Sequence, residues 1–345
     1  GPNNVIGGNT QNGIEVDAGA VYLPNFIMGN RIGLSNINGT HVGNTLSGIG
    51  VDTNPSTDPA YFNPSMTGLI IGPANVIADN QGANNNNFPD VLGSDNAGII
   101  ITGASTGIKV LGNTIGIAEF PAGTPLASKA YANLGDGIII TTSGNQIGGS
   151  GASGNIIAAS ARHGIVVSGS GTTGNSFLGN SVGVHPGLAG NLTLGNGVDG
   201  FHIDNASSTT IGGTGASDFN TIAANGRNGI KIVNGGTQNG WGNLVQRNRI
   251  YHNAVSTAGV GIDLDRAQNA SNPLITSPPE IPANYTNLDQ AQPVICTAPG
   301  NSGACAGSTA PASVGGSTTL QWTLATHGPA SFRVVFTRAN RSSSA

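Results

Sequence analysis

The sequence predicts an all-β solenoid, in which short strands stack in successive coils, and two observations support this. First, a long phrase recurs: Ile147-Gly148-Gly149 through Arg162-His163-Gly164-Ile165 returns as Ile211-Gly212-Gly213 through Arg227-Asn228-Gly229-Ile230. One such unit cannot bury its apolar face alone and must stack on its neighbours. Second, glycine supplies 56 of 345 residues and charged residues only 8%. β-Branched and turn-forming residues abound and helix formers are scarce, so the coils are built from strands.

The clearest strand of the repeat follows a glycine and alternates apolar residues. Eight copies predict about eight coils: Gly13-Ile14-Glu15-Val16, Gly48-Ile49-Gly50-Val51, Gly98-Ile99-Ile100-Ile101, Gly137-Ile138-Ile139-Ile140, Gly164-Ile165-Val166-Val167, Gly200-Phe201-His202-Ile203, Gly229-Ile230-Lys231-Ile232 and Gly261-Ile262-Asp263-Leu264. Strand side chains alternate between the two faces, so the first and third residues after each glycine face the core. The inward column is therefore Ile14, Ile49, Ile99, Ile138, Ile165, Phe201, Ile230 and Ile262.

A second strand of the coil has an asparagine at a fixed place before an apolar residue. Its copies are Gly29-Asn30-Arg31-Ile32, Gly112-Asn113-Thr114-Ile115, Gly179-Asn180-Ser181-Val182 and Arg247-Asn248-Arg249-Ile250. Asparagine tolerates left-handed backbone conformations, and its side chain both donates and accepts hydrogen bonds. We expect these asparagines to be structural, bending the chain and bonding to the adjacent coil.

Several phrases together carry a resemblance: Asn145-Gln146-Ile147-Gly148-Gly149, Asn220-Thr221-Ile222-Ala223-Ala224-Asn225, Arg227-Asn228-Gly229-Ile230-Lys231-Ile232 and Gly112-Asn113-Thr114-Ile115-Gly116. They resemble the right-handed parallel β-helix repeats of large secreted bacterial surface proteins. That superfamily also contains pectate lyases, polygalacturonases, alginate epimerases and phage tailspikes. The resemblance covers residues 1 to about 270 and implies the fold and an extracellular or cell-surface location. It does not imply an activity, because one architecture serves enzymes and passive fibres alike.

The repeat ends after Asp265, and residues 271–345 are expected to form a small C-terminal β element. Proline-rich sequence leads to two candidate strands, 318–324 and 331–337, which we interpret as a hairpin that covers the last coil or begins a sandwich domain. Cys296 and Cys305 enclose a Pro/Gly/Ser loop, and their spacing permits a local disulfide. Because the chain begins inside a repeat, we expect it to be a fragment of a longer protein.

The charge balance narrows the class of partner. The formal net charge is −4, which disfavours a general nucleic-acid surface. No apolar run approaches the roughly 20 residues that span a bilayer. A glycan or another cell-envelope component is the expected partner.

Charged residues cluster at the two ends of the main strand's outer face, and the cluster at the C-terminal end is the candidate site. Its outward column is Glu15, Gly50, Ile100, Ile139, Val166, His202, Lys231 and Asp263. Two positions further along each strand lie Asp204 and Asp265, and the residues before the glycines add Arg162, His163, Asp199, Arg227 and Asn228. The candidate catalytic residues, which offer acid, base and cation-binding groups, are Asp199, His202, Asp204, Lys231 and Asp263. Asp263 and Asp265 are also candidate calcium ligands.

Two functions stay open on this basis. The favoured one is a structural or adhesive module that presents loops from a stiff rod, because no complete catalytic signature is present: Arg162-His163-Gly164 lacks the glycine that polygalacturonases place before this histidine. The same charges can form a solvated face of mutually offsetting pairs. The alternative is a polysaccharide lyase, epimerase or hydrolase. A cleft walled by the inserts at 81–95 and 119–133 favours the enzyme, and a flat outer face favours the scaffold.

Overall fold

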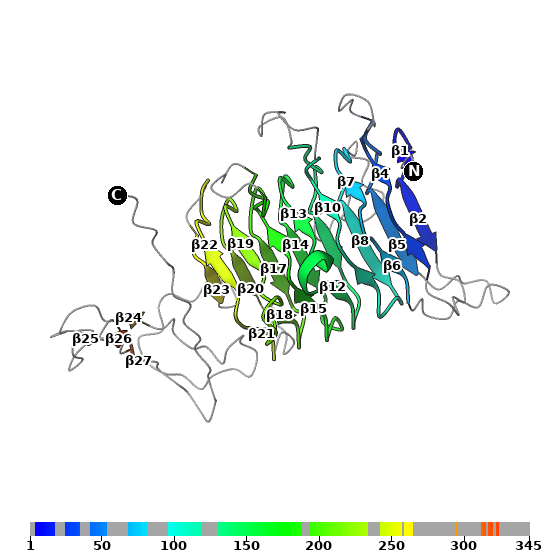
Figure 1. The fold of residues 1–345 in the computed structure, drawn as a ribbon. Coiled ribbons are helices and arrows are strands. Elements are labelled where there is room, and N and C mark those ends of the chain that lie inside the picture. The colour runs from blue at the N-terminus through cyan, green and yellow to red at the C-terminus, as the bar shows by residue number, and fades with distance from the viewer. Residues whose placement is uncertain are drawn as a thin grey trace, which may run out of the picture.

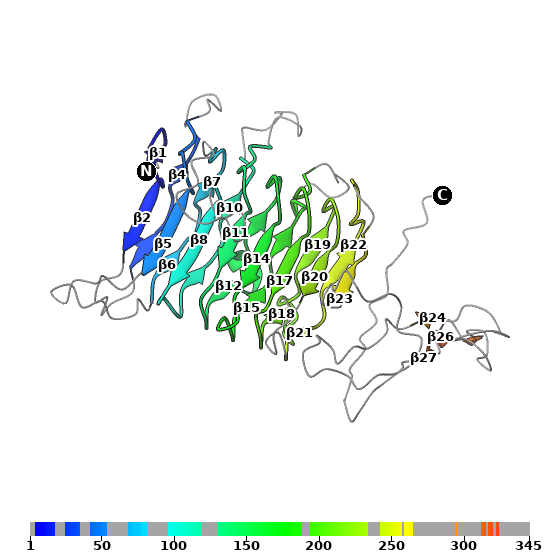
Figure 2. The ribbon, with the colours of Figure 1, turned by 180° about the vertical axis from the view of Figure 1, so that it is seen from behind.

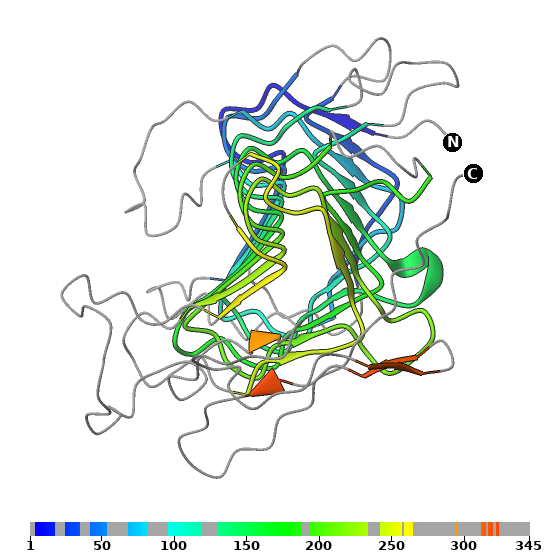
Figure 3. The same ribbon diagram turned by 90° about the vertical axis from the view of Figure 1, so that its left-hand side faces the viewer.

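The protein is a right-handed parallel β-helix, as the sequence predicts (Figures 1 and 2). The computed structural model describes residues 4–17, 25–34, 42–53, 68–81, 96–118, 130–187, 194–233, 242–256 and 259–264, with four short strands between residues 294 and 323. Each coil contributes one strand in turn to three parallel sheets, called here sheets A, B and C. Figure 3, which looks along the stack, shows the strands as walls around an interior.

The strands of each sheet come from every third element of the chain. Sheet A contains β1 (Val5–Ile6), β4 (Arg31–Ile32), β7 (Val76–Ile77), β10 (Thr114–Ile115), β13 (Ile156–Ile157), β16 (Ser181–Val182), β19 (Thr221–Ala223) and β22 (Arg249–Tyr251). Sheet B contains β2 (Ile14–Asp17), β5 (Ile49–Thr53), β8 (Ile99–Gly103), β11 (Ile138–Ile140), β14 (Ile165–Ser168), β17 (Phe201–Asp204), β20 (Ile230–Val233) and β23 (Ile262–Leu264). Sheet C contains β3 (Phe26–Ile27), β6 (Ile70–Ile71), β9 (Lys109–Val110), β12 (Gln146–Gly148), β15 (Ser176–Leu178), β18 (Thr210–Ile211) and β21 (Leu244–Val245).

The core is a continuous apolar column inside the three sheets. The predicted inward residues from Ile49 through Ile230 have no exposed surface, and Phe177 of sheet C meets Phe201 of sheet B edge to face, with ring centroids 5.3 Å apart. Ile14 is partly buried, and Ile262, on the last strand of sheet B, is 41% exposed. Burial is therefore complete only where a coil has neighbours on both sides, as expected for a stacked fold.

Two columns of buried asparagine connect the coils and confirm the structural role predicted for this residue. The side-chain amide of one asparagine donates to the Oδ1 atom of the next, and at most steps the main-chain N–H does so too; between Asn113 and Asn155 these distances are 3.0 and 2.9 Å. The first asparagine ladder precedes the strands of sheet A and comprises Asn4, Asn30, Asn75, Asn113, Asn155, Asn180, Asn220 and Asn248. The second follows those strands and comprises Asn9, Asn44, Asn80, Asn133, Asn196, Asn225 and Asn253, with Ser160 between Asn133 and Asn196.

The glycine that opens each sheet B strand leaves room for the second asparagine ladder. A β-carbon on Gly200 would lie 2.6 Å from the carbonyl oxygen of Gly229 and 2.8 Å from the side-chain nitrogen of Asn225. Contacts that short displace backbone, so only glycine lets the coils approach this closely. The repeated glycine that marks the strands in the sequence is thus a packing requirement.

The described C-terminal strands are short and antiparallel, so this part of the chain does contain β structure. β24 (Val294–Ile295) pairs with β27 (Trp322–Thr323), and β25 (Ala312–Val314) pairs with β26 (Ser317–Thr319). The predicted strand 318–324 is thus divided between two pairs, and its predicted partner, 331–337, lies outside the described residues. Cys296 and Cys305 lie outside them too. Among the residues that the structure describes, no helix has the length and apolar character to cross a bilayer.

Candidate functional site

The sheet B register brings together the outward residues that the alternation pattern predicts. His202 pairs with Lys231, and Lys231 pairs with Asp263, on strands β17, β20 and β23. Toward the N-terminus the same column continues through Val166, Ile139 and Ile100. The column is therefore polar at its C-terminal end and apolar in the middle, as expected.

A second outer column lies beside it and consists of the residue before each strand-opening glycine. In it, a side chain accepts a hydrogen bond from the main-chain N–H of the same position one coil later, so we call it the capping column. Its links are Asn12 to Ser47 (2.8 Å), Asp136 to His163 (2.7 Å), His163 to Asp199 (3.2 Å), Asp199 to Asn228 (2.9 Å) and Asn228 to Val260 (2.8 Å). Five hydrogen bonds between coils thus depend on a polar side chain as the acceptor, and two of the five accepting side chains are aspartates.

Asp199 is the centre of this site. One carboxylate oxygen, Oδ1, accepts from both the main chain and the side chain of Asn228, at 2.9 and 3.0 Å. The other, Oδ2, faces two imidazoles: the Nδ1 atoms of His202 and His163 lie 3.2 and 3.4 Å away. The two rings are tilted against each other with centroids 4.6 Å apart. One oxygen of a buried carboxylate therefore faces two neighbouring histidines. The side chain of His163 is 12% exposed and that of His202 is 18% exposed.

The two aspartates of the capping column have pKa values shifted in opposite directions. Burial opposes ionisation of Asp199, but the adjacent His163 and His202 imidazoles and the hydrogen bonds from Asn228 outweigh it and hold the pKa of Asp199 well below its usual range. At Asp136 burial dominates over the nearby His163 and raises the pKa. Its Oδ2 atom is buried and has no hydrogen-bond partner. Asp199 is thus a stable anion, whereas Asp136 has a raised affinity for a proton.

The remaining predicted residues form a looser group around Asn228. The Nδ2 atom of Asn228 reaches Asp263 Oδ2 at 3.3 Å, and Lys231 Nζ lies 3.7 Å from the same oxygen. Asp204 accepts from the Asn205 side chain at 3.1 Å, and burial raises its pKa against the effect of His202. The five predicted residues therefore belong to one neighbourhood but make two separate contacts, Asp199 with His202 and Lys231 with Asp263.

The interpretation of these charges as a solvated face does not hold for Asp199 and Lys231, whereas His202, Asp204 and Asp263 keep partial exposure. Asp199 is 1% exposed, Asp136 is fully buried and Lys231 is 8% exposed. For the two aspartates the reason is that the capping column uses one carboxylate oxygen of each for a main-chain hydrogen bond, which places them beneath the outer surface. Asp265, one of the two candidate calcium ligands, lies outside the described residues, as do 82–95 and 119–129, which make up most of the inserts expected as cleft walls.

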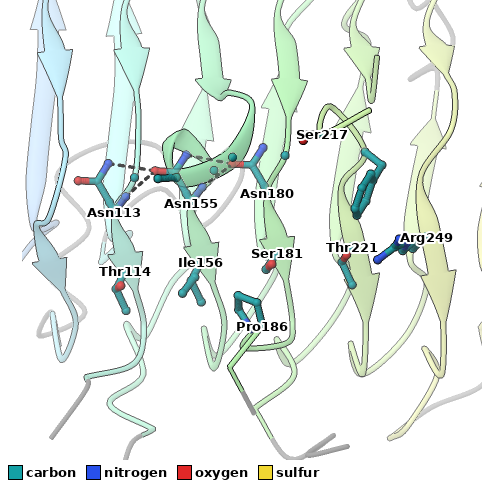
Figure 4. Close-up of a pocket in the computed structure, with 16 residues that line it drawn as sticks. Asn113, Thr114, Asn155, Ile156, Asn180, Ser181, Pro186, Ser217, Thr221 and Arg249 are labelled. Carbon is teal, nitrogen blue, oxygen red and sulfur yellow. Dashed lines mark hydrogen bonds between the residues drawn. The ribbon is translucent and has the colours of Figure 1, made fainter. Parts of the chain in front are cut away.

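A groove that the sequence pattern does not predict lies on a different face, along the outside of sheet A. It has a volume of about 550 Å³ and crosses five neighbouring strands, from β10 to β22. Figure 4 shows its floor, which presents one side chain per coil: Thr114, Ile156, Ser181, Thr221 and Arg249. Strands spaced about 4.8 Å apart make this floor roughly 19 Å long.

Two insertions at the corner between sheets C and A wall this groove. The first contains the 3-10 turn η2 (Gly151–Ser153), and the second contributes Ser217 and Phe219. A hydrogen bond of 2.8 Å from Ser150 Oγ to Asp218 Oδ1 joins them. At the end of the floor, the Arg249 guanidinium lies 4.0 Å from the centre of the Phe219 ring, a cation–π contact. Pro186 also lines the groove.

Two functional features escaped the sequence prediction. His163 was placed near the charged cluster but not among the candidate catalytic residues, and the groove on sheet A was not anticipated. For His163 a signal existed, since Asp136, His163 and Asp199 all precede strand-opening glycines. No protein-family model, curated protein or solved structure matches this chain.

Proposed function

We propose that this β-helix is a glycan-binding module of an extracellular or bacterial cell-surface protein, and that the glycan lies in the groove on sheet A. The observation that carries the proposal is the shape of that groove, about 550 Å³ in volume and open along five consecutive coils. Its direction follows the stack, so a polymer of repeating units meets one equivalent side chain per coil. A compact metabolite is too short to contact the equivalent side chains that repeat along the groove floor.

The groove chemistry suits a sugar chain. Thr114, Ser181 and Thr221 supply hydroxyl groups that donate and accept, and Ile156 and Phe219 supply apolar surface for the C–H faces of sugar rings. Arg249 is exposed and adds the positive charge that a uronate or other acidic substituent requires. The expected ligand is therefore an acidic glycan bound lengthwise.

Binding of uronate-rich and neutral glycans to the purified chain, with and without calcium, tests this function. Arg249→Gln should weaken binding of the acidic glycan by at least about tenfold, since a hydrogen bond to a charged group contributes about 1.5–3 kcal/mol. Arg227→Gln is the matched control, because it removes the same charge from an exposed arginine beside sheet B. Equal loss in both variants, or no binding by the wild-type chain, contradicts a site in this groove.

A second proposal is catalysis on a polysaccharide at sheet B, as a lyase, epimerase or hydrolase. It is favoured by one observation: the imidazole of His202 is partly exposed and its Nδ1 atom contacts an ionised, buried carboxylate. A carboxylate in that position orients an imidazole for proton transfer. Product formation on the same glycan panel tests it, and turnover that persists in His202→Asn rules out this histidine as the acid or base.

A further inference from the structure

The capping column contains more chemistry than hydrogen bonding between coils requires. Asn12 and Asn228 cap the next coil through an amide oxygen, so neither a carboxylate nor an imidazole is needed for that role. Asp199 performs it with Oδ1 alone. Its Oδ2 atom is left facing the Nδ1 atoms of His163 and His202, and the three residues each offer one ligand atom within 4.8 Å of the other two.

The spacing of these atoms is long for charge-assisted hydrogen bonds and also fits the ligand corners of a metal ion. The two N···O distances are 3.2 and 3.4 Å, whereas a charge-assisted N–H···O bond is typically about 2.7–2.9 Å long. Zinc binds imidazole nitrogen at about 2.0–2.1 Å and carboxylate oxygen at about 2.0–2.2 Å, so ligand atoms at the corners of a tetrahedron lie about 3.3 Å apart. Both measured edges agree with that separation.

The surroundings hold the ligand atoms in place. Asn228 fixes the Asp199 carboxylate through two hydrogen bonds to Oδ1, which directs Oδ2 toward the histidines. Asp136 holds the main chain of His163, and His202 lies on strand β17 between two paired strands. Such outer contacts orient metal ligands and strengthen their binding.

We propose that His163, Asp199 and His202 bind a divalent transition-metal ion, with zinc as the expected ion, through the two Nδ1 atoms and Oδ2. Imidazole with a single carboxylate selects zinc and its neighbours, whereas calcium takes oxygen ligands only. Binding replaces the 3.2 Å hydrogen bond from the Asp199 amide to His163 Nδ1 with a metal bond. His202, the most exposed of the three, marks the side on which a fourth ligand enters.

Titration calorimetry of the chelator-treated chain with zinc chloride, and cobalt absorption spectra, test this site without any glycan. We expect one zinc ion to bind per chain, and the cobalt absorption spectrum to show the bands of tetrahedral coordination. His202→Asn should weaken zinc affinity at least about tenfold. That is the lower end of the loss expected when residues that support a metal centre are replaced. Asparagine can still donate to Asp199 from nearly the same position, and His202→Gln is a second variant should the first fold poorly. Unfolding measured in chelator checks that both variants retain the fold.

The matched control is His252→Asn. His252 is exposed, and its φ of 50° is one that asparagine tolerates, so this variant removes a histidine without straining the backbone. It should bind zinc like the wild type. The proposal is overturned if the wild-type chain binds no zinc at micromolar concentration, or if His202→Asn and the control keep the same affinity. Failure of glycan binding at Arg249 leaves this result unaffected, because the two sites lie on different sheets.

Discussion

The asparagine ladders and the capping column perform the same task with different residues. In both, a side chain of one coil accepts a hydrogen bond from the main-chain N–H of a neighbouring coil. In the first ladder every position is asparagine, and the Oδ1 atom of Asn155, at its centre, accepts two hydrogen bonds. In the capping column aspartate, histidine and asparagine alternate, one aspartate oxygen has no partner, and another faces two imidazoles. Where folding alone selects the residue, asparagine recurs; the departures from it mark the positions where other chemistry is expected.

The largest effect should come from breaking the first ladder at its centre. Asn155→Ala removes the acceptor shared by the main-chain and side-chain nitrogens of Asn113, and it removes a donor to the Val110 carbonyl. Because all three groups are buried, we expect a loss of about 2 to 4 kcal/mol in the free energy of unfolding. Urea denaturation followed by circular dichroism measures it.

The same substitution at the end of the ladder is the control. Asn4 is exposed and makes one side-chain bond, to Asn30 at 2.9 Å, so Asn4→Ala should cost less than about 1 kcal/mol. Equal costs at the two positions would mean that the ladder does not act through buried hydrogen bonds.

The capping column should respond to loss of charge in opposite directions at its two aspartates. Asp199→Asn replaces an anion that accepts hydrogen bonds from Asn228 and His202, so it should destabilise the chain by about 1–3 kcal/mol near neutral pH. Asp136→Asn keeps an acceptor for the His163 N–H and removes a carboxyl whose charge is disfavoured by burial. It should raise the denaturation midpoint at neutral pH, by less than Asp199→Asn lowers it.

The pH dependence separates the same two residues. The folded pKa of Asp199 is depressed, so its contribution is complete above the unfolded value of about 3.9 and is lost as the pH falls below it. The folded pKa of Asp136 is raised, so its contribution is present below about pH 3.9 and is lost as the pH rises through the folded value. Denaturation midpoints across acid and neutral pH, in chelator, test both. Parallel curves for the two variants would show the opposite signs to be wrong.

A smaller gain should follow from repairing the second ladder. Ser160 interrupts it, and its buried hydroxyl has no hydrogen-bond partner. Its main-chain N–H already donates to Asn196 Oδ1 at 3.1 Å, and the opposing residue, Gly137, has no side chain to obstruct a longer one. Ser160→Asn should therefore stabilise the chain by about 1 kcal/mol. Ser160→Ala is the control; thermal unfolding that favours alanine over asparagine would show that the site cannot hold the amide.

The smallest effect is expected for the ion pair at the end of the outward column. Lys231 Nζ and Asp263 Oδ2 are 3.7 Å apart, and the aspartate side chain is 24% exposed. Asp263→Asn should cost less than about 1 kcal/mol, and the difference should shrink in high salt. Denaturation at two salt concentrations measures it. If Asp263→Asn lowered the free energy of unfolding as much as Asp199→Asn does, at both salt concentrations, this pair would have to be a buried interaction and not an exposed ion pair.

The sequence predicted most of the fold because glycine and alternation determine the phase of each sheet B strand. That phase correctly aligned His202, Lys231 and Asp263. It could not settle the role of His163, because His163 precedes the glycine, where the chain turns and the alternation rule stops. The groove was missed for a related reason: the insertions containing Gly151–Ser153 and Phe219 lie at a corner, and no periodicity tells which sheet a corner insertion will wall.

The ladders also bear on how such a chain can change its length over evolutionary time. Successive members of the first ladder, such as Asn155 and Asn180, are one coil apart and interchangeable in their bonding. A gene duplication or deletion with boundaries at two such codons adds or removes a whole coil, and every remaining asparagine still meets another. The change costs only the lost or gained coil and its interface. Unequal recombination between the repeats therefore offers a route to longer or shorter rods that needs no compensating mutation in the core.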